Sequence, residues 1–418
     1  MVKRFFVVSE TRLWLAVALW IVTLFFTIPI ARALQGVVRE SLGSSSFGYF
    51  VITVVIFSTV VVLYKIRERL SLKSSSFWWL LVCATVLIAY TIRLWDNPVE
   101  AVHFVQYGIL TILAFLALGC RHKNSWVYLA AFLVTVIVGI IDEGIQWLVP
   151  NRIWGLSDIG INSLSALIMC LAIAFGIKPK GYSNQALSST KVLVCNLAIV
   201  SLLLIFFSLA NTPNIIKWYG EKIDALNYLV DNGQVMTEYG YLYEDNEIGV
   251  FRSRYNANAL ILEDQLRASE AAEKLDLAAE PEDYLEFIRR YSPITDPFLH
   301  ELRVHLNRRD YYLLTGQRIQ RYEQKELLRR LRIAWYENRI VEKYFPQTLA
   351  QSSFTLSPNE REIAQKGETL NNLYVSPVSK ALITRVSKTV LLIGVSILIL
   401  FILLLRWRFK KGEIRVSV

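Results

Sequence analysis

Cysteine is scarce in this chain, and its placement limits the chemistry that the chain can carry. The 418 residues include 4 Cys, all in or at the ends of apolar runs: Cys83, Cys120, Cys170 and Cys195. Residues 211–388 contain none, which excludes a disulfide framework and a cysteine-based zinc site there. A Walker loop, a G-x-S-x-G elbow, a dinucleotide fingerprint and a C-x-x-C pair are also missing. These absences disfavour a nucleotide-driven pump, and we expect neither a cofactor nor a metal.

Basic residues are in excess, but only in one part of the chain. The formal net charge is +10, whereas residues 211–388 hold 24 basic and 26 acidic residues and all other residues hold 21 and 9. A basic excess confined to short segments beside apolar runs is a membrane-topology signal, and it argues against nucleic acid as a partner.

Long apolar runs account for the 54% hydrophobic content. Runs of the length needed to cross a bilayer predict about eight transmembrane helices. They lie near residues 13–30, 47–64, 77–95, 101–120, 126–149, 158–177, 192–210 and 389–405. We therefore predict an all-α polytopic membrane protein with four parts: 1–45, a first span and an outer loop; 46–210, a membrane helical domain; 211–388, an extracytoplasmic domain; and 389–418, a last span with a basic tail.

The basic residues also predict the orientation. If the amino terminus is cytoplasmic, the cytoplasmic segments carry 17 of the 21 basic residues that lie outside 211–388. The exceptions are Arg32, Arg39, Arg93 and Arg152. Both termini are then cytoplasmic, and residues 211–388 lie outside the membrane.

Ionisable side chains interrupt the fifth and sixth runs near their outer ends. Asp142 and Glu143 lie four and three residues before Gln146, and Asp158 lies four residues before Asn162, so the members of each pair share a helix face. An ionisable group inside a bilayer costs about 3 kcal/mol or more on insertion scales and marks a functional site by default. The alternative is that these groups only hydrogen-bond to one another and hold the helices together.

Further polar residues fall at the same predicted depth. His103, Gln106 and Tyr107 open the fourth run, with His103 and Tyr107 four apart, so three helices bring polar groups together. Taken by itself, His103 would be a weak signal, and an interhelical hydrogen-bonding role would be favoured for it. Arg152, on the outer link, is either the counter-ion of the carboxylates or an anchor to lipid headgroups.

These residues resemble a known family. The segments Glu100 to Gly108 and Asp142 to Arg152, followed by Asp158 and Asn162, resemble the VanZ-like bacterial membrane proteins over about residues 45–180. Two positions depart from that pattern: Val99-Glu100 replaces an Asp-Lys pair, and Ser165 replaces a glycine. The resemblance implies a bacterial plasma-membrane protein with a role in the cell envelope, linked in some members to resistance to teicoplanin-type glycopeptides. It implies no settled biochemical activity.

Residues 211–388 predict a mainly helical domain with a small β-hairpin. We expect helices over 214–232, 257–279, 282–291, 296–315 and 317–345, and a short helix after Pro358. The hairpin is expected from 235–243 and 248–252 about a four-residue turn at 244–247.

One histidine pair in this domain resembles a metalloprotease motif but fails its spacing. His300 and His305 are five apart, whereas the zinc motif needs four. A helix face is instead shared by Glu301, His305, Arg308, Arg309 and Tyr312. It predicts either an internally paired or solvated polar face or a surface for an anionic glycan or a protein. The run from Arg318 to Arg339 alternates in sign and predicts an exposed, ion-paired helix without chemistry.

Three functions fit the sequence. The first is a non-catalytic envelope protein whose outer polar cluster binds a lipid headgroup, a lipid-linked precursor or a glycopeptide, with residues 211–388 recruiting a protein partner. The second is an enzyme acting on a lipid-linked substrate, with Glu143 as acid or base, Asp158 as its partner and His103 as a proton relay. The third is a structural subunit of a larger membrane complex.

Overall fold

The computed structural model divides the chain into two compact units. One comprises residues 1–207 and 393–418, and the other comprises residues 208–392. The structure describes residues 9–416 except 44, 70–73, 96–98, 151, 153, 184–186, 318–323, 369–373, 379–381 and 384–385. Arg318, the first residue of the predicted ion-paired run, and residue 151 in the segment Asp142 to Arg152 lie outside these described residues.

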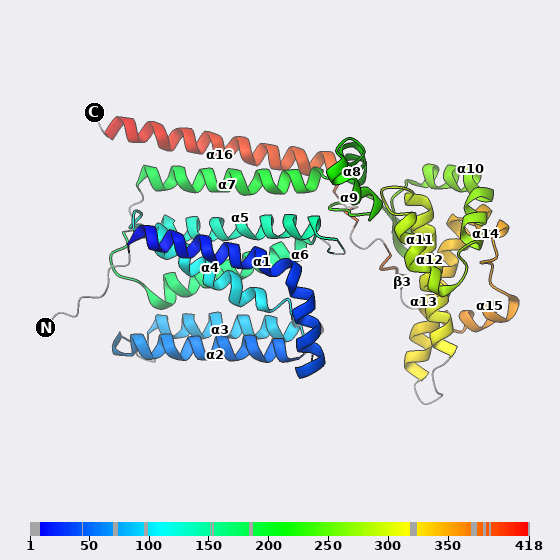
Figure 1. Cartoon of the computed structure of the whole chain (residues 1–418), viewed down its shortest axis with the longest axis horizontal. Coiled ribbons are helices and arrows are strands. Elements are labelled where there is room, and N and C mark those ends of the chain that lie inside the picture. Colours follow the sequence, from blue (N-terminus) through cyan, green and yellow to red (C-terminus); the bar gives the residue numbers. More distant parts are fainter. Residues whose placement is uncertain are drawn as a thin grey trace. The chain divides into compact units, whose positions relative to one another are not determined.

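The first unit is built from helices alone among its described residues (Figure 1). They are α1 (Glu10–Leu42), α2 (Ser46–Ile66), η1 (Arg67–Arg69), α3 (Ser75–Arg93), α4 (Val102–Leu118), α5 (Trp126–Leu148), α6 (Leu156–Leu171), η2 (Ala172–Ile177), α7 (Ser188–Ala210) and α16 (Lys388–Val416). Seven of the helices in the described chain are long and apolar enough to cross a membrane. The chain is therefore a multi-pass membrane protein. The predicted fourth span forms α4, whose 17 residues are at the short end of the spanning range.

The first helix is longer than predicted. We expected an outer loop after residue 30, but α1 continues as one helix of 33 residues to Leu42. Pro29 lies inside it, and Figure 1 shows the helix bending part-way along its length. Proline removes one backbone hydrogen bond and clashes with the preceding turn, so it bends a helix without having to end it.

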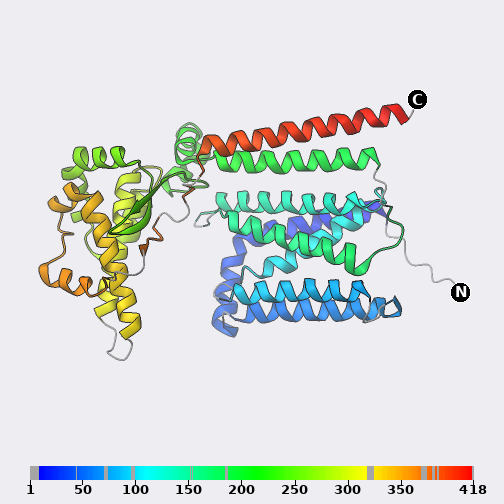
Figure 2. The ribbon, with the colours of Figure 1, turned by 180° about the vertical axis from the view of Figure 1, so that it is seen from behind.

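Contacts between distant segments join the helix ends that carry the basic residues. Arg121 pairs with Glu10 at 2.6 Å, and Lys178 donates to the Ser75 hydroxyl at 2.8 Å. Arg406 on α16 donates to Asn196 on α7 at 2.6 Å, and both views show these two helices side by side (Figures 1 and 2). These contacts agree with a topology in which the basic segments gather at one end of the helical unit.

Helices α4, α5 and α6 form the centre of this unit, with small residues at their crossings. Ala114 on α4 and Val127, Ala130 and Ala131 on α5 are fully buried in one apolar cluster. Tyr107 packs with Val17 and Leu24 of α1 in a second cluster. Small side chains let helices approach closely in a membrane, where packing replaces the hydrophobic effect as the driving force.

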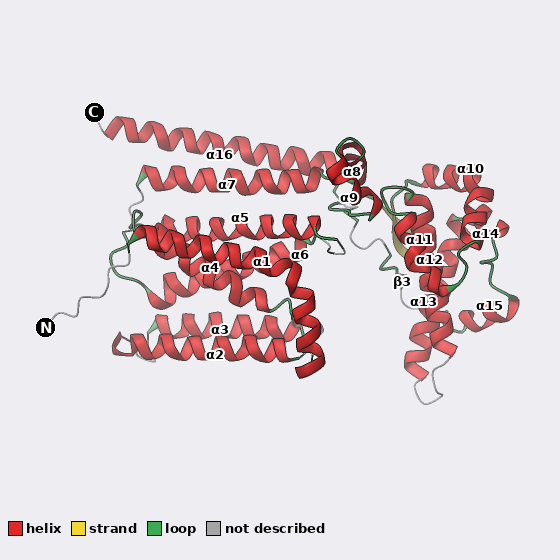
Figure 3. Cartoon of the chain, in the orientation of Figure 1, coloured by secondary structure: helices red, strands yellow, loops and turns green. Residues whose placement is uncertain are grey.

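The second unit is mainly helical with a small sheet (Figure 3). Its elements are α8 (Pro213–Gly220), η3 (Asp224–Leu226), α9 (Asn227–Asp231), β1 (Tyr241–Asp245), β2 (Gly249–Ser253), α10 (Ala257–Asp276), η4 (Pro281–Asp283), α11 (Tyr284–Arg290), α12 (Pro297–Gln317), α13 (Gln324–Tyr344), α14 (Pro346–Gln351), α15 (Pro358–Gln365) and β3 (Tyr374–Val375). Its core is filled by α12 and α13, through buried residues such as Phe298, Leu302, Ala334 and Ile340.

Several predicted elements of this unit needed correction. The helix predicted over 214–232 is broken into α8, η3 and α9, because the chain folds back where a Cβ on Gly220 would lie 2.5 Å from Val230. The hairpin pairs Asp245 with Gly249, so its turn is shorter than predicted. Gly249 has a φ of 113°, which favours glycine, and its backbone closely approaches Tyr374 of the parallel strand β3. Neither β3 nor α14 was predicted.

Candidate functional site

The two carboxylates of α5 are buried and held by hydrogen bonds. Asp142 is 5% exposed and Glu143 is 0% exposed. The Gln146 amide donates to Asp142 at 3.1 Å and to Glu143 at 2.8 Å, as the helical spacing predicted. The other Glu143 oxygen accepts from the backbone N–H of Gly155, at 3.1 Å, just before α6 begins. Glu143 thus ties the end of α5 to the start of α6.

Gly139 brings the three central helices together at this level. A Cβ on Gly139 would lie 3.1 Å from Cβ of Asn162 on α6 and 3.5 Å from the ring of Tyr107 on α4. Asn162 is 0% exposed and Tyr107 is 1% exposed. The ring of His103 stacks on that of Tyr107 with 5.8 Å between centroids. The sequence predicted this convergence of three helices, and the structure brings His103, Tyr107, Asn162 and the α5 carboxylates together.

Several polar atoms in this cluster are buried without a hydrogen bond. His103 faces the Asn162 side chain and Tyr107 faces Asp142. Even so, Nδ1 of His103, the Tyr107 hydroxyl and both amide atoms of Asn162 make no aligned hydrogen bond within the described residues. An unsatisfied buried polar group costs about 1–3 kcal/mol, so such a concentration needs a reason.

Arg152 supplies the positive charge of the cluster. It interacts electrostatically with His103, Asp142, Glu143 and Asp158, and its Nη2 donates to the carbonyl of Ile28 on α1 at 3.1 Å. This supports the counter-ion interpretation. Asp158 is only partly buried, and it lies close enough to Glu143 for the two carboxylates to repel each other. No group of three or more His, Cys, Asp or Glu side chains in the described chain could hold a metal ion.

Two residues of the site differ from the sequence-based expectation. Gln106 contacts α1 through its backbone carbonyl, which accepts from the Trp20 indole at 2.9 Å, and a binding role for its side chain stays a prediction. Trp154 was not predicted. It is 7% exposed, and its indole N–H has no partner among the described residues. A tryptophan on a short link between spans normally indicates only anchoring at the membrane interface. The sequence therefore gave no signal that Trp154 would be buried.

The glycine contact gives a direct test of the helix convergence. We expect Gly139→Leu to push α5 away from α4 and α6, and to lower the free energy of unfolding by about 1–3 kcal/mol, as overpacking usually does. Gly144→Leu on the same helix is the matched control, because no atom of the described residues lies within 4 Å of a Cβ built there. Thermal unfolding in detergent measures both. Equal melting temperatures for the two variants would contradict the packing described here.

The polar face predicted on α12 lies mostly in the interior of the second unit. Glu301, His305 and Arg309 are 1%, 0% and 2% exposed, so these residues cannot form a ligand surface. The internally paired alternative describes them: Glu301 accepts from the backbone of Arg254 at 2.9 Å. The surface interpretation remains a hypothesis only for Arg308 and Tyr312, where the guanidinium lies 4.9 Å from the ring centroid.

Glu337 of α13 is the centre of this buried network. It accepts from His305 at 2.6 Å and from Arg308 at 3.0 Å, and also from the hydroxyls of Tyr374 and Ser376. Burial alone would raise the pKa of Glu337, but these partners hold it below its ordinary value. The prediction of an exposed, ion-paired helix is therefore confirmed around Glu326, which pairs with Arg329 and Arg330. It is wrong at Glu337, which is buried.

The second unit should lose stability as the pH falls. Burial lowers the pKa of His300 to about 4, so the folded form binds fewer protons than the unfolded form between pH 4 and 6.5. Stability therefore falls as the pH drops through that window.

Asp245 acts in a lower pH range. Burial would raise the pKa of Asp245, but Lys343 and Tyr344 hold it at about 2. The stability that Asp245 adds is present above its ordinary pKa of 3.8 and is lost as the pH falls toward 2.

Hydrogen exchange of α12 and α13 peptides in the full chain measures this dependence. We expect exchange protection to decrease from pH 6.5 to pH 4, after correction for intrinsic rates. His300→Gln should flatten that slope, because a neutral amide can still donate to the carbonyl of Tyr291, which lies 3.0 Å from the His300 ring. An unchanged slope in that variant would assign the effect to other groups.

Comparison with known proteins adds no family assignment. No family model, no curated protein and no solved structure matches the chain. The resemblance to VanZ-like proteins therefore rests on the motif residues alone.

Proposed function

We propose that the cluster at α4, α5 and α6 binds the polar headgroup of a membrane amphiphile, in a VanZ-like protein of the bacterial cell envelope. In this proposal both termini are cytoplasmic, the cluster faces the outer leaflet, and residues 211–388 serve a partner outside the membrane. The observation that carries the proposal is the group of buried polar atoms on His103, Tyr107 and Asn162 that make no aligned hydrogen bond within the described residues.

The chemistry of these atoms supports a particular kind of headgroup. The imidazole, phenol and amide groups offer neutral donors and acceptors, which suit hydroxyl or amide groups. Arg152 adds a positive charge that suits a phosphate. A headgroup that combines a phosphate with hydroxyl or amide groups uses both features, as in a phospholipid such as phosphatidylglycerol or in a lipid-linked envelope precursor.

The contacts of the carboxylates support a role in holding α5 and α6 together more than a catalytic role. Both Glu143 oxygens already accept hydrogen bonds, one from Gln146 and one from Gly155. His103 faces Asn162 rather than a carboxylate. A general acid or base must reach a proton on the substrate, and Glu143 would first have to release a partner. We therefore propose binding without catalysis.

Phosphatidylglycerol is the probe that tests this proposal. Its binding to the full chain in nanodiscs can be measured by native mass spectrometry against phosphatidylcholine, which has no headgroup donor. We expect preferential binding of phosphatidylglycerol, and about tenfold weaker binding in Tyr107→Phe, because one hydrogen bond of roughly 1–1.5 kcal/mol is removed.

Tyr128→Phe on α5 is the matched control, because Tyr128 packs against Phe115 away from the cluster. Its affinity should equal that of the wild type. Equal affinity for both lipids, unaffected by Tyr107→Phe, would refute headgroup binding of this kind. Displacement of the lipid by a teicoplanin-type glycopeptide would show that the drug uses the same groups.

A further inference from the structure

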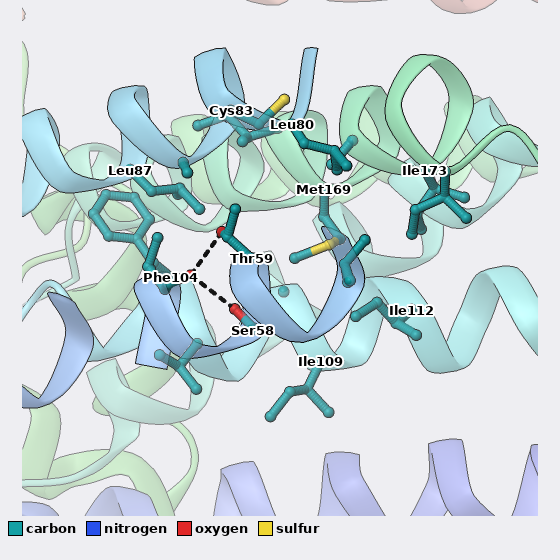
Figure 4. Close-up of a pocket in the computed structure, with 18 of the residues that line it drawn as sticks. Ser58, Thr59, Leu80, Cys83, Leu87, Phe104, Ile109, Ile112, Met169 and Ile173 are labelled. Atoms are coloured by element: carbon teal, nitrogen blue, oxygen red, sulfur yellow. Dashed lines mark hydrogen bonds between the residues drawn. The ribbon is translucent and has the colours of Figure 1, made fainter. Parts of the chain in front are cut away.

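An apolar cavity lies on another face of the helices that carry the polar cluster. It has a volume of about 360 Å³, within the range of roughly 300–1,000 Å³ that is typical of ligand pockets. Its walls come from α2, α3, α4, α6 and η2 (Figure 4). Phe104 and Gly108 line it on α4, each directly following a cluster residue, His103 or Tyr107.

The lining cannot hold a polar ligand. Its two hydroxyl groups, on Ser58 and Thr59, both donate to the carbonyl of Val55, at 3.1 and 2.7 Å (Figure 4). The side chains labelled around them are apolar or sulfur-containing, including Leu80, Ile112 and Met169. An occupant of this cavity must therefore be a hydrocarbon.

The length and the opening of the cavity fit one chain of a lipid. Along α4 the lining runs from Phe104 to Leu116, which spans roughly 18 Å at 1.5 Å per residue. One leaflet of a bilayer has a hydrocarbon depth of about 15 Å, half of the 30 Å core. Leu116 is 44% exposed and Ser58 is also exposed, so the cavity opens sideways on helices of spanning length, where bilayer hydrocarbon is the surrounding solvent.

We infer that the ligand of the polar cluster is a lipid whose hydrocarbon chain occupies the cavity between α2, α3, α4 and α6. The inference rests on the proposed function and deepens it, because it assigns a place in the fold to the hydrocarbon chain of the amphiphile. Helices α4 and α6 then hold both parts of one molecule: the headgroup near His103 and Asn162, and the chain beside Gly108 and Met169.

A photoreactive lipid tests the inference. Phosphatidylglycerol with a diazirine midway along one acyl chain is incorporated into nanodiscs with the full chain, irradiated, and its attachment sites are mapped by mass spectrometry. We expect attachment to peptides of α2 and α4 that line the cavity. Ala84→Phe, which fills the cavity from α3, should reduce this attachment about tenfold, since a packed side chain leaves no room for the probe.

Ala89→Phe is the matched control on α3, because Ala89 is exposed and does not line the cavity. Its attachment should stay at the wild-type level. Ile109→Trp fills the same cavity from α4 and serves as the second variant if Ala84→Phe does not fold.

Tyr107→Phe separates the two proposals. Reduced attachment in this variant supports both the chain site and its link to the headgroup. Attachment that Ala84→Phe blocks but Tyr107→Phe leaves unchanged supports the chain site and counts against the proposed function. Phosphatidylglycerol binding that depends on Tyr107, with no attachment in the cavity, overturns the chain site and leaves the proposed function standing.

Discussion

Glu337→Gln should lower the free energy of unfolding of the second unit by about 3–5 kcal/mol. Glu337 is 0% exposed and accepts hydrogen bonds from donors on α12 and in the β3 segment. A glutamine amide has one acceptor oxygen and places a donor where a carboxylate oxygen had accepted, so several buried donors lose their partner. Hydrogen exchange of α13 amides in the full chain should accelerate by about two to four orders of magnitude.

The same substitution at Glu326 provides the control. Glu326 also lies on α13 and pairs with Arg329 and Arg330, but its side chain is 36% exposed and water can replace the lost contacts. Its exchange rates should match the wild type. If Glu337→Gln behaves like Glu326→Gln, then the buried network does not stabilise this unit.

Asn162→Leu should weaken phosphatidylglycerol binding about 100-fold, because two hydrogen bonds of roughly 1–1.5 kcal/mol each are removed. Without the lipid, the same variant should be at least as stable as the wild type. Both amide atoms of Asn162 are buried and make no aligned hydrogen bond within the described residues, so an apolar side chain of similar volume removes an unsatisfied group. Lipid titration and thermal unfolding in lipid-free detergent measure the two effects on one preparation.

The control for this substitution is Asn196→Leu on α7, at an exposed position where the amide contacts Arg406. Its lipid affinity should not change. If Asn162 only joined helices, Asn162→Leu would lose an interhelical hydrogen bond, worth about 0.6 kcal/mol on average in membrane proteins, and would melt earlier. A lower melting temperature with unchanged lipid binding would support that alternative.

Hydropathy and helical spacing predicted the helical membrane fold and the polar groups of the site. The contacts of Gln146 with Asp142 and Glu143 follow from spacings of four and three within one helix, which the sequence states directly. The sequence predicted only that the polar residues of α4 and α5 lie at the same depth in the membrane, and not that the two helices meet at Gly139. Depth follows from topology, whereas the face that a helix turns to its neighbour depends on packing.

Other features depended on contacts between residues far apart in the sequence. Strand β3 pairs with β2 through Gly249 and Tyr374, and two residues are too few to give a strand pattern. Glu337 lies in a run of alternating charge that reads as an exposed helix, and only tertiary packing buries it. The first span was bounded by its apolar run near residues 13–30, and hydropathy could not show that α1 continues past Pro29 to Leu42.

The most direct test is a cryo-electron microscopy structure of the full chain in phosphatidylglycerol nanodiscs. The proposed function predicts headgroup density within hydrogen-bonding distance of His103 Nδ1, the Tyr107 hydroxyl and the Asn162 amide. A cluster without lipid density, in which these three groups bond only to one another, would contradict it.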